Sequence, residues 1–412
     1  MINYVKKLHV ENIGLFDFLE VNFSPKMNII IGANGSGKTS ILRYLTFCFS
    51  HRHLQTSRFR KGAEYWMNAI FDGKPIIVGT TNIIDSNQEF RQFKALRWNK
   101  IPDKNELVTH LPHENVPYNL LAIGANRFFD YQKIKGMQQE KKGTERKQDY
   151  DSKNTTFLDR PELPAIKQWM INRYFIIDKE WSVTEKKNWN RIINYLPQIA
   201  PKHLEFKFER IERDLEPLFS VNNKICYLEE LSSGFKSILS IIFSIVDWCE
   251  GINEAEKGLV ENAQGTVLID EIDAHLHPEW QMNITSHLKE LFPNLQFIIT
   301  THSPHIVATA ENNEVIIIPE HNGSIKLKAE EKSFKGWQLD YILEDLMNLI
   351  DKQELLSDAL LANLDKALSD KNINHFDKEL EVLKSTLHPN DPIVKVYQLK
   401  RNQLLLNTQS DD

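Results

Sequence analysis

A glycine-rich stretch that contains one lysine and one threonine, Gly32–Thr39, has the residue types and spacing needed to bind phosphate groups. Its glycines allow the backbone to wrap around an anion with several N–H groups pointing inward. Lys38 would reach the β- and γ-phosphates of a nucleoside triphosphate, and the Thr39 hydroxyl would bind Mg²⁺. We expect the phosphate contacts to come from seven consecutive residues: Asn34, Gly35, Ser36, Gly37, Lys38, Thr39 and Ser40.

A second set of candidate catalytic residues follows two apolar runs further along the chain. The run 266–269 ends in Asp270 and Glu271, which predicts a Walker B motif downstream of a phosphate-binding loop. Asp270 would bind Mg²⁺, and Glu271 would accept a proton from an attacking water. The run 296–300 precedes His302, a candidate phosphate contact, because α/β folds bind ligands at the carboxyl ends of their strands.

The segment Ser232-Ser233-Gly234 precedes a strongly apolar predicted helix, 238–248, and allows two interpretations. A serine at this position is typical of a helix cap. The same helix start could instead bind an anion. Taken without the other motifs, the segment favours the cap.

The elements that would position these residues alternate between strands and helices, which predicts an α/β fold. Half-buried strands are expected over 4–12 and 18–23, and fully buried strands before the motifs. Residues 314–318 and 324–327 are expected to close the sheet as a hairpin over the Asn-Gly pair at 322–323.

Three further regions have distinct compositions. A small antiparallel sheet is expected within 51–110, beside the main sheet. The polar segment 133–154 predicts a flexible surface loop, and residues 157–220 have a helical pattern. From Gly336 onward the chain is expected to be helical, without another chemical motif.

Length and charge exclude some classes of function. The 412 residues carry a net charge of −6, which argues against a chain that coats nucleic acid through its overall charge. Local contact with DNA or RNA stays open at two basic segments, 51–61 and 133–154. The longest apolar runs are shorter than the roughly 18 residues of a membrane span, so no membrane contact is predicted.

The thiols and histidines do not predict a zinc site. Cys48, Cys226 and Cys249 lack paired metal-binding spacing, and we expect reduced thiols in a cytoplasmic protein. His275 and His277 form an i, i+2 pair with no third ligand nearby. The start of the chain has no signal-peptide pattern, which agrees with a cytoplasmic location.

The order of the motifs resembles that of ABC-type ATPases: Walker A, signature, Walker B and a histidine switch. The family signature is Leu-Ser-Gly-Gly-Gln, whereas this chain has Leu-Ser-Ser-Gly at 231–234, followed by Phe235. This departure is common in the non-transporter branch, which includes SMC, Rad50, RecF and OLD-type ATPases. The run 270–281 resembles the Asp-Glu…His-Leu-His-Pro…Gln block of OLD-like proteins.

Two shorter blocks resemble stand-alone anti-phage defence ATPases, such as the PtuA subunit of Septu systems and retron-associated ATPases. These blocks are 121–127 and Gly336-Trp337 with the helix that follows. The catalytic motifs themselves cover roughly residues 1–50 and 225–320.

The resemblance implies a P-loop NTPase of ABC-ATPase type that binds ATP and Mg²⁺. It also implies a head-to-head homodimer in which residues 232–234 of one subunit complete the ATP site of the other. Glu271 would be the general base and His302 the γ-phosphate sensor, and Gln132 is a candidate for the family's Q-loop glutamine. The implied catalytic residues are Lys38, Glu271 and His302.

We expect four parts in this chain, and we expect neither a long coiled coil nor a Toprim nuclease domain. The ATPase head would comprise 1–130 and 226–330, with an inserted helical lobe at 131–225 and a helical extension at 331–412. The lobe lacks sustained heptads, so a long coiled coil is not expected. No Toprim-like acidic pattern follows residue 320, so this chain is not expected to cut DNA itself.

These observations predict a dimeric ATPase that regulates a partner nuclease or toxin effector in bacterial anti-phage defence. One alternative is a RecF-like DNA repair or recombination ATPase that binds duplex DNA. Another is a scaffold that uses ATP only to hold its dimer together, without turnover.

Overall fold

The chain forms two compact units, Met1–Met347 and Asn348–Asp412, in the computed structural model. Part of the basic segment 51–61 lies outside the described residues. The structure describes residues 2–49, 57–83, 107–108, 118–127, 131–159, 166–253, 255–319, 323–347, 352–370, 372–386 and 392–409.

A five-stranded parallel sheet forms the centre of the first unit. Its strands lie in the order β13-β3-β12-β11-β7, and every neighbouring pair is parallel. Both faces are covered, which explains why the strands read as continuous apolar runs. Their carboxyl ends meet at one edge, where the predicted motifs begin. The strands are β3 (Met27–Ile31), β7 (Leu120–Ile123), β11 (Gly265–Ile269), β12 (Leu295–Thr300) and β13 (Val315–Ile317).

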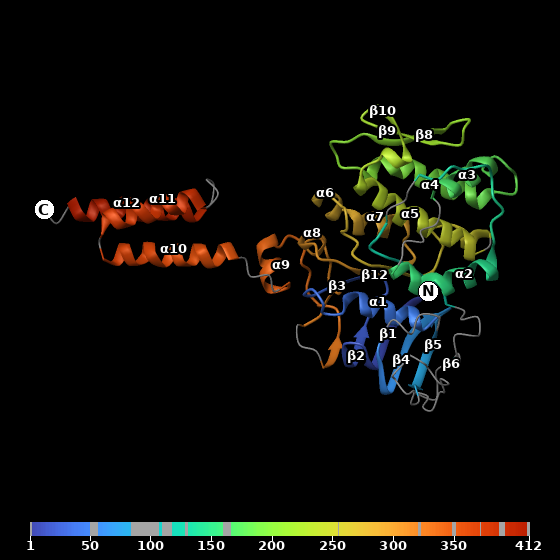
Figure 1. Cartoon of the computed structure of the whole chain (residues 1–412), viewed down its shortest axis with the longest axis horizontal. Coiled ribbons are helices and arrows are strands. Elements are labelled where there is room, and N and C mark those ends of the chain that lie inside the picture. The colour runs from blue at the N-terminus through green and yellow to red at the C-terminus, as the bar shows by residue number, and fades with distance from the viewer. Residues whose placement is uncertain are drawn as a thin grey trace. The chain divides into compact units, whose positions relative to one another are not determined.

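One face of this sheet packs on α1 (Lys38–Phe47), which lies between it and a second sheet of six strands (Figure 1). Leu45 of α1 shares a core with Ile298 of the parallel sheet and Val10 of the second sheet. The second sheet has the order β14-β2-β1-β4-β5-β6. Its strands are β1 (Tyr4–Ile13), β2 (Phe16–Asn22), β4 (Phe59–Phe71), β5 (Lys74–Ile83), β6 (Leu107–Val108) and β14 (Ser324–Leu327).

The other face packs on α5 (Ser233–Ile252), and α5 in turn contacts a helical lobe (Figure 1). A buried ion pair joins the lobe to α5: Arg173 Nε donates to the Glu250 carboxylate at 2.7 Å. Burial raises the pKa of Glu250 to about 7, and Arg173 opposes this rise. The lobe helices are α2 (Gly143–Asp159), α3 (Ile166–Ile176) and α4 (Val183–Ile199).

The prediction of a surface loop over 133–154 is wrong in its second half, where α2 begins at Gly143. The helix is polar, but specific side-chain bonds hold it in place. The Asn154 amide donates to Leu120 O at 2.9 Å and accepts from Ala122 N at 3.0 Å. Arg146 and Tyr150 both donate to Asp247 of α5. Low hydrophobicity therefore did not mean disorder here, because hydrogen bonds to β7 and α5 add to the packing of the buried Tyr150 ring.

The helical prediction for 157–220 fails at its end, where three antiparallel strands form a small sheet in the order β10-β9-β8. Asn222 and Asn223 both have positive φ, 49° and 62°, in the two-residue turn between β9 and β10. An Asn-Asn turn of this kind is a hairpin signal. The strands are β8 (Phe206–Ile211), β9 (Pro217–Val221) and β10 (Lys224–Tyr227).

The predicted hairpin between 314–318 and 324–327 is also wrong. β13 pairs with β3 in the parallel sheet, whereas β14 pairs in parallel with β2 of the second sheet. The two strands therefore belong to different sheets. Ile316 and Ile325 nevertheless enter the same apolar core, so both segments are buried strands as expected, although their pairing is not the expected one.

The first unit ends with α9, whose Ile342 is fully buried in the same core as α5. Among the described residues, no helix is long and apolar enough to cross a membrane. The remaining elements in the described residues of this unit are two 3₁₀ helices, Leu228–Glu230 and Ala255–Gly258, and α6 (Pro278–Gln281), α7 (Ile284–Leu291), α8 (Pro304–Val307) and α9 (Leu339–Asp345).

In the described residues of the second unit, three helices form a small bundle with its own core. Leu364, Phe376, Leu383 and Tyr397 pack together in this core. The helices are α10 (Lys352–Ser369), α11 (Ile373–Thr386) and α12 (Pro392–Gln409).

Candidate functional site

The glycine-rich loop joins β3 to α1, the strand and helix that its sequence requires. Gly37 caps α1 with φ +100°, and a Cβ there would lie 2.5 Å from Phe16 Cζ. Gly35 also has positive φ, +79°, but no atom lies within 4 Å of its Cβ position. Glycine is therefore required at position 37 by both the backbone conformation and the packing against Phe16. At position 35 only the backbone conformation favours glycine, since a side chain would meet open space.

The Lys38 ammonium is held inside this loop. Its Nζ donates to Gly32 O at 2.8 Å and to Ala33 O at 2.9 Å, and the residue is 7% exposed. Burial lowers the pKa of Lys38, while the carboxylates of Asp270, Glu271 and others raise it in opposition. The positive charge thus lies where the triphosphate is expected, beside the Walker B acids.

Walker A and Walker B meet directly. The Thr39 hydroxyl lies 3.0 and 2.9 Å from the two carboxylate oxygens of Asp270, which is 4% exposed. Thr300, at the end of β12, donates to Asp270 Oδ1 at 2.6 Å. In P-loop enzymes, a carboxylate and a hydroxyl at this position hold Mg²⁺ together with oxygens of the phosphates.

Glu271 is turned away from the strand by its backbone. Its φ is +45°, a left-handed conformation rare for a non-glycine residue, and its side chain is exposed. The Glu271 N–H donates to Thr300 Oγ1 at 2.7 Å. Thr300 therefore contacts both acidic residues, of which Asp270 is buried and Glu271 is exposed.

His302 lies after β12 on the same edge. Its backbone N–H donates to Asp273 Oδ1 at 3.2 Å, and the same oxygen accepts from Thr301 Oγ1 at 2.6 Å. Partial burial lowers the pKa of His302, and the Lys38 ammonium lowers it further. A neutral imidazole near Lys38 is suited to donate one hydrogen bond to a phosphate oxygen.

Ser36 fits a bound phosphate for a separate reason. Its hydroxyl oxygen is buried and has no hydrogen-bond partner among the described residues. A buried hydroxyl without a partner is unfavourable, and a phosphate oxygen would satisfy it. Together with the left-handed glycines, this group makes the loop compatible with a nucleotide.

The predicted signature lies at the start of α5. Ser232 occupies the N-cap position but makes no side-chain cap hydrogen bond, so the cap interpretation is wrong on this point. Ser232 and Ser233 are exposed, while Gly234 is buried. A Cβ on Gly234 would lie 2.5 Å from Trp280 Cζ3. Phe235, which replaces the family glutamine, packs edge-on against Trp280 with ring centroids 4.9 Å apart.

The structure thus groups some of the predicted residues and leaves others apart. Within the described residues, no hydrogen bond or ion pair joins Ser232, Ser233 or Gly234 to the loop 32–40. Gln132 is exposed, and its Q-loop role stays a prediction. The predicted residues that the structure brings to one edge are Lys38, Thr39, Asp270, Glu271 and His302.

Arg127 is a site residue to which the sequence alone assigned no role. It is 1% exposed, and its Nη2 donates to the main-chain oxygens of both Asp270, at 3.1 Å, and Glu271. Its Nη1 is buried without a hydrogen-bond partner among the described residues. Burial lowers the pKa of Arg127 to about 10, so the guanidinium stays charged at neutral pH. The only sequence signal was an arginine placed after the apolar run 120–123.

We predict that Arg127→Lys lowers the kcat for ATP hydrolysis by about tenfold to hundredfold with little change in KM, because a lysine cannot hold both carbonyls and Glu271 would be misplaced. Steady-state kinetics measure both parameters. Arg191→Lys is the matched control, since half-buried Arg191 also donates to a main-chain oxygen, Glu290 O, at 3.0 Å. Equal kcat values in Arg127→Lys and the wild type would contradict a positioning role.

The fold and the motif geometry define a P-loop ATPase of the ABC type, which confirms the α/β fold class inferred from the sequence. Residues 27–308 match the family described as "AAA domain, putative AbiEii toxin, Type IV TA system". This match covers more than half of the chain, and the protein belongs to that family.

The sequence similarities agree with the resemblance to defence ATPases. The chain is 28% identical to Septu protein PtuA of Bacillus thuringiensis, with 96% of this chain and 97% of that protein aligned. It is 26% identical to the retron Ec83 probable ATPase of Escherichia coli, over 84% of this chain and 77% of that protein. Among solved structures, an SMC head bound to the C-winged helix domain of ScpA aligns with 80% of this chain and 98% of its own, at 15% identity and a TM-score of 0.47.

Proposed function

We propose that this protein binds and hydrolyses ATP with Mg²⁺, and that its nucleotide state regulates a partner nuclease or toxin effector in anti-phage defence. One observation carries the catalytic part: the Thr39 hydroxyl lies within 3.0 Å of the Asp270 carboxylate, although 231 residues separate them. The full-length similarity to Septu PtuA supports the biological part.

In the proposed reaction, each residue has a separate task. The loop N–H groups and Lys38 bind the phosphates, and Thr39 and Asp270 hold Mg²⁺, which neutralises phosphate charge when bound. Glu271 accepts the proton of the attacking water, since it is exposed whereas Asp270 is buried. His302 donates to the γ-phosphate as a neutral imidazole.

The remaining part of the site would come from a second copy of the chain. The Ser232 and Ser233 hydroxyls are exposed, and Ser232 is not used as a cap. The backbone N–H groups at the start of the 20-residue helix α5 point out of its N-terminal end, as in any helix, and this arrangement favours binding of an anion. In the proposed homodimer these groups bind the γ-phosphate held by the partner's Walker A loop.

We also propose the four-part organisation, with the head at 1–130 and 226–330, the lobe at 131–225 and the extension at 331–412, in a cytoplasmic protein. The lobe and the extension would offer surfaces to the effector. The relatives' association with Septu and retron systems supports an effector supplied by another chain.

A phage challenge tests this function. Phage should form fewer plaques on cells that carry this gene with its native neighbouring genes than on cells that carry the Glu271→Gln variant with the same neighbours. Protection that persists after this gene is deleted would contradict the proposal. Salt-dependent binding of duplex DNA by the isolated, purified chain would favour the RecF-like alternative instead.

A further inference from the structure

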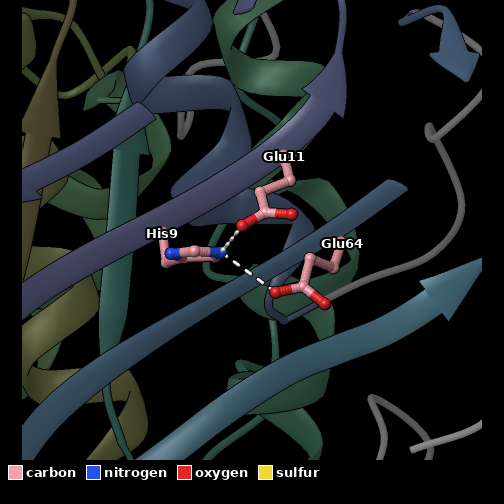
Figure 2. A group of neighbouring side chains, drawn as sticks. All are labelled: His9, Glu11 and Glu64. Atoms are coloured by element: carbon pink, nitrogen blue, oxygen red, sulfur yellow. Dashed lines mark hydrogen bonds and ion pairs between the residues drawn. The ribbon is translucent and has the colours of Figure 1, made fainter. Parts of the chain in front are cut away.

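Three side chains with metal-binding atoms meet on the outer face of the six-stranded sheet, away from the core. His9 and Glu11 are two residues apart on β1 and therefore share a face, and Val10 between them enters the core. Glu64 of β4 lies directly opposite Glu11 in the antiparallel register. Figure 2 shows the imidazole and the two carboxylates pointing toward one another.

The distances suit a shared cation. His9 Nε2 lies 3.0 Å from Glu64 Oε1 and 3.2 Å from Glu11 Oε1 (Figure 2). The three ligand atoms all lie within 4.8 Å of one another. Ligands about 2.1 Å from a zinc ion are separated from each other by roughly 3.0–3.4 Å. Small side-chain adjustments would therefore bring all three atoms into one coordination sphere.

The histidine ring is held in this orientation by aromatic neighbours. Trp66 stacks on it with ring centroids 4.6 Å apart and an interplanar angle of 10°, and Phe18 packs edge-on at 5.4 Å. His9 is only 8% exposed. The nitrogen ligand is therefore positioned before any ion arrives, which reduces the entropy lost on binding.

The charges also favour a cation. Glu11 and Glu64 face each other across the register, and like charges in this position destabilise a sheet. Within the described part of the chain, His9 is the one residue that forms ion pairs with either carboxylate. Glu20, which faces His9 in the register, is already paired with Lys7 at 3.2 Å. Two carboxylates beside one imidazole thus need positive charge.

We propose that His9 Nε2 and the carboxylates of Glu11 and Glu64 bind one Zn²⁺ ion, with water as the remaining ligand. A set of one imidazole and two carboxylates suits Zn²⁺, whereas Mg²⁺ prefers oxygen and water alone. The ion joins β1 to β4 and stabilises the second sheet. The residues are separate from those of the nucleotide site.

Zinc binding to the full-length protein without nucleotide tests the proposal. Competition with a chromophoric chelator should show one Zn²⁺ per chain, and saturating Zn²⁺ should raise the Tm. Removal of one ligand should weaken binding by at least about tenfold. His9→Phe keeps an aromatic ring on Trp66, and Glu64→Gln keeps the side-chain shape. The control is His203→Ala, which removes an exposed histidine 3.3 Å from the Glu279 carboxylate.

The proposal is supported if both ligand variants weaken binding and the control does not. It is overturned if the wild type takes up no Zn²⁺, or if His9→Phe binds Zn²⁺ as well as the wild type. A cluster held together only by a protonated histidine would give the first of these results. Equal uptake of Mg²⁺ and Zn²⁺ would also overturn it.

Discussion

Replacing Glu271 with glutamine is expected to slow ATP hydrolysis by about 10²–10⁴-fold while ATP binding is retained. The amide keeps the size of the carboxylate but cannot accept a proton from the attacking water. Asp270, Thr39 and Lys38 remain in place, so the nucleotide should still bind. Phosphate release measures turnover, and equilibrium binding of a fluorescent ATP analogue measures affinity.

This substitution also separates an enzyme from a scaffold. Because hydrolysis would no longer release the nucleotide, the Glu271→Gln chain should accumulate as an ATP-bound dimer in size-exclusion chromatography. Glu261→Gln is the control, since Glu261 is exposed and pairs with Arg191 at 3.2 Å. If turnover of Glu271→Gln equals that of the wild type, Glu271 is not the general base and the scaffold alternative gains support.

Replacing Lys38 with methionine is expected to weaken ATP binding by at least about a hundredfold, since charge-assisted hydrogen bonds contribute about 1.5–3 kcal/mol each and Lys38 offers several donors. The apolar side chain keeps most of the length of lysine, and the loop carbonyls of Gly32 and Ala33 lose only the contacts measured at 2.8 and 2.9 Å. Isothermal titration with ATP and Mg²⁺ measures the affinity directly.

Lys26→Met is the matched control for this change. Lys26 lies just before β3, at the end of the strand opposite to the loop, and its ammonium also donates to a main-chain oxygen, Pro293 O, at 2.7 Å. Its removal should leave ATP affinity within about twofold of the wild type, as expected for an exposed contact. Similar losses in both variants would indicate that Lys38 acts through general stability and not through the phosphates.

The parts of the fold that the sequence predicted are those whose local pattern already required them. The strands before Gly32, Asp270 and Thr301 are buried on both faces, so continuous apolar runs marked them. Their parallel arrangement then placed the residues that follow them at one edge of the sheet. The expectation that Thr39 and Asp270 share a metal needed no information beyond these runs and the motif types.

The parts that were missed depend on long-range contacts. The helix α2 has little apolar surface, and it is Asn154 and Asp247 that attach it to β7 and α5. β14 was paired with the wrong neighbour because the Asn-Gly pair at 322–323 predicts a hairpin turn, and a turn signal does not specify which strand lies beside β14. Arg127 contacts main-chain oxygens, which carry no sequence signal of their own.

Mixing two inactive variants tests the composite ATP site most directly. Ser232→Arg places a bulky side chain in the signature, and Lys38→Met disables Walker A, so each variant alone should lack activity. If the site is shared between two chains, half of the dimers in an equal mixture contain one intact site, and about a quarter of wild-type hydrolysis should return. Two results would contradict a shared site. The mixture could stay inactive while wild-type chains mixed in parallel remain active, or Ser232→Arg could hydrolyse ATP normally by itself. Either result would mean that a chain completes its ATP site without a second copy.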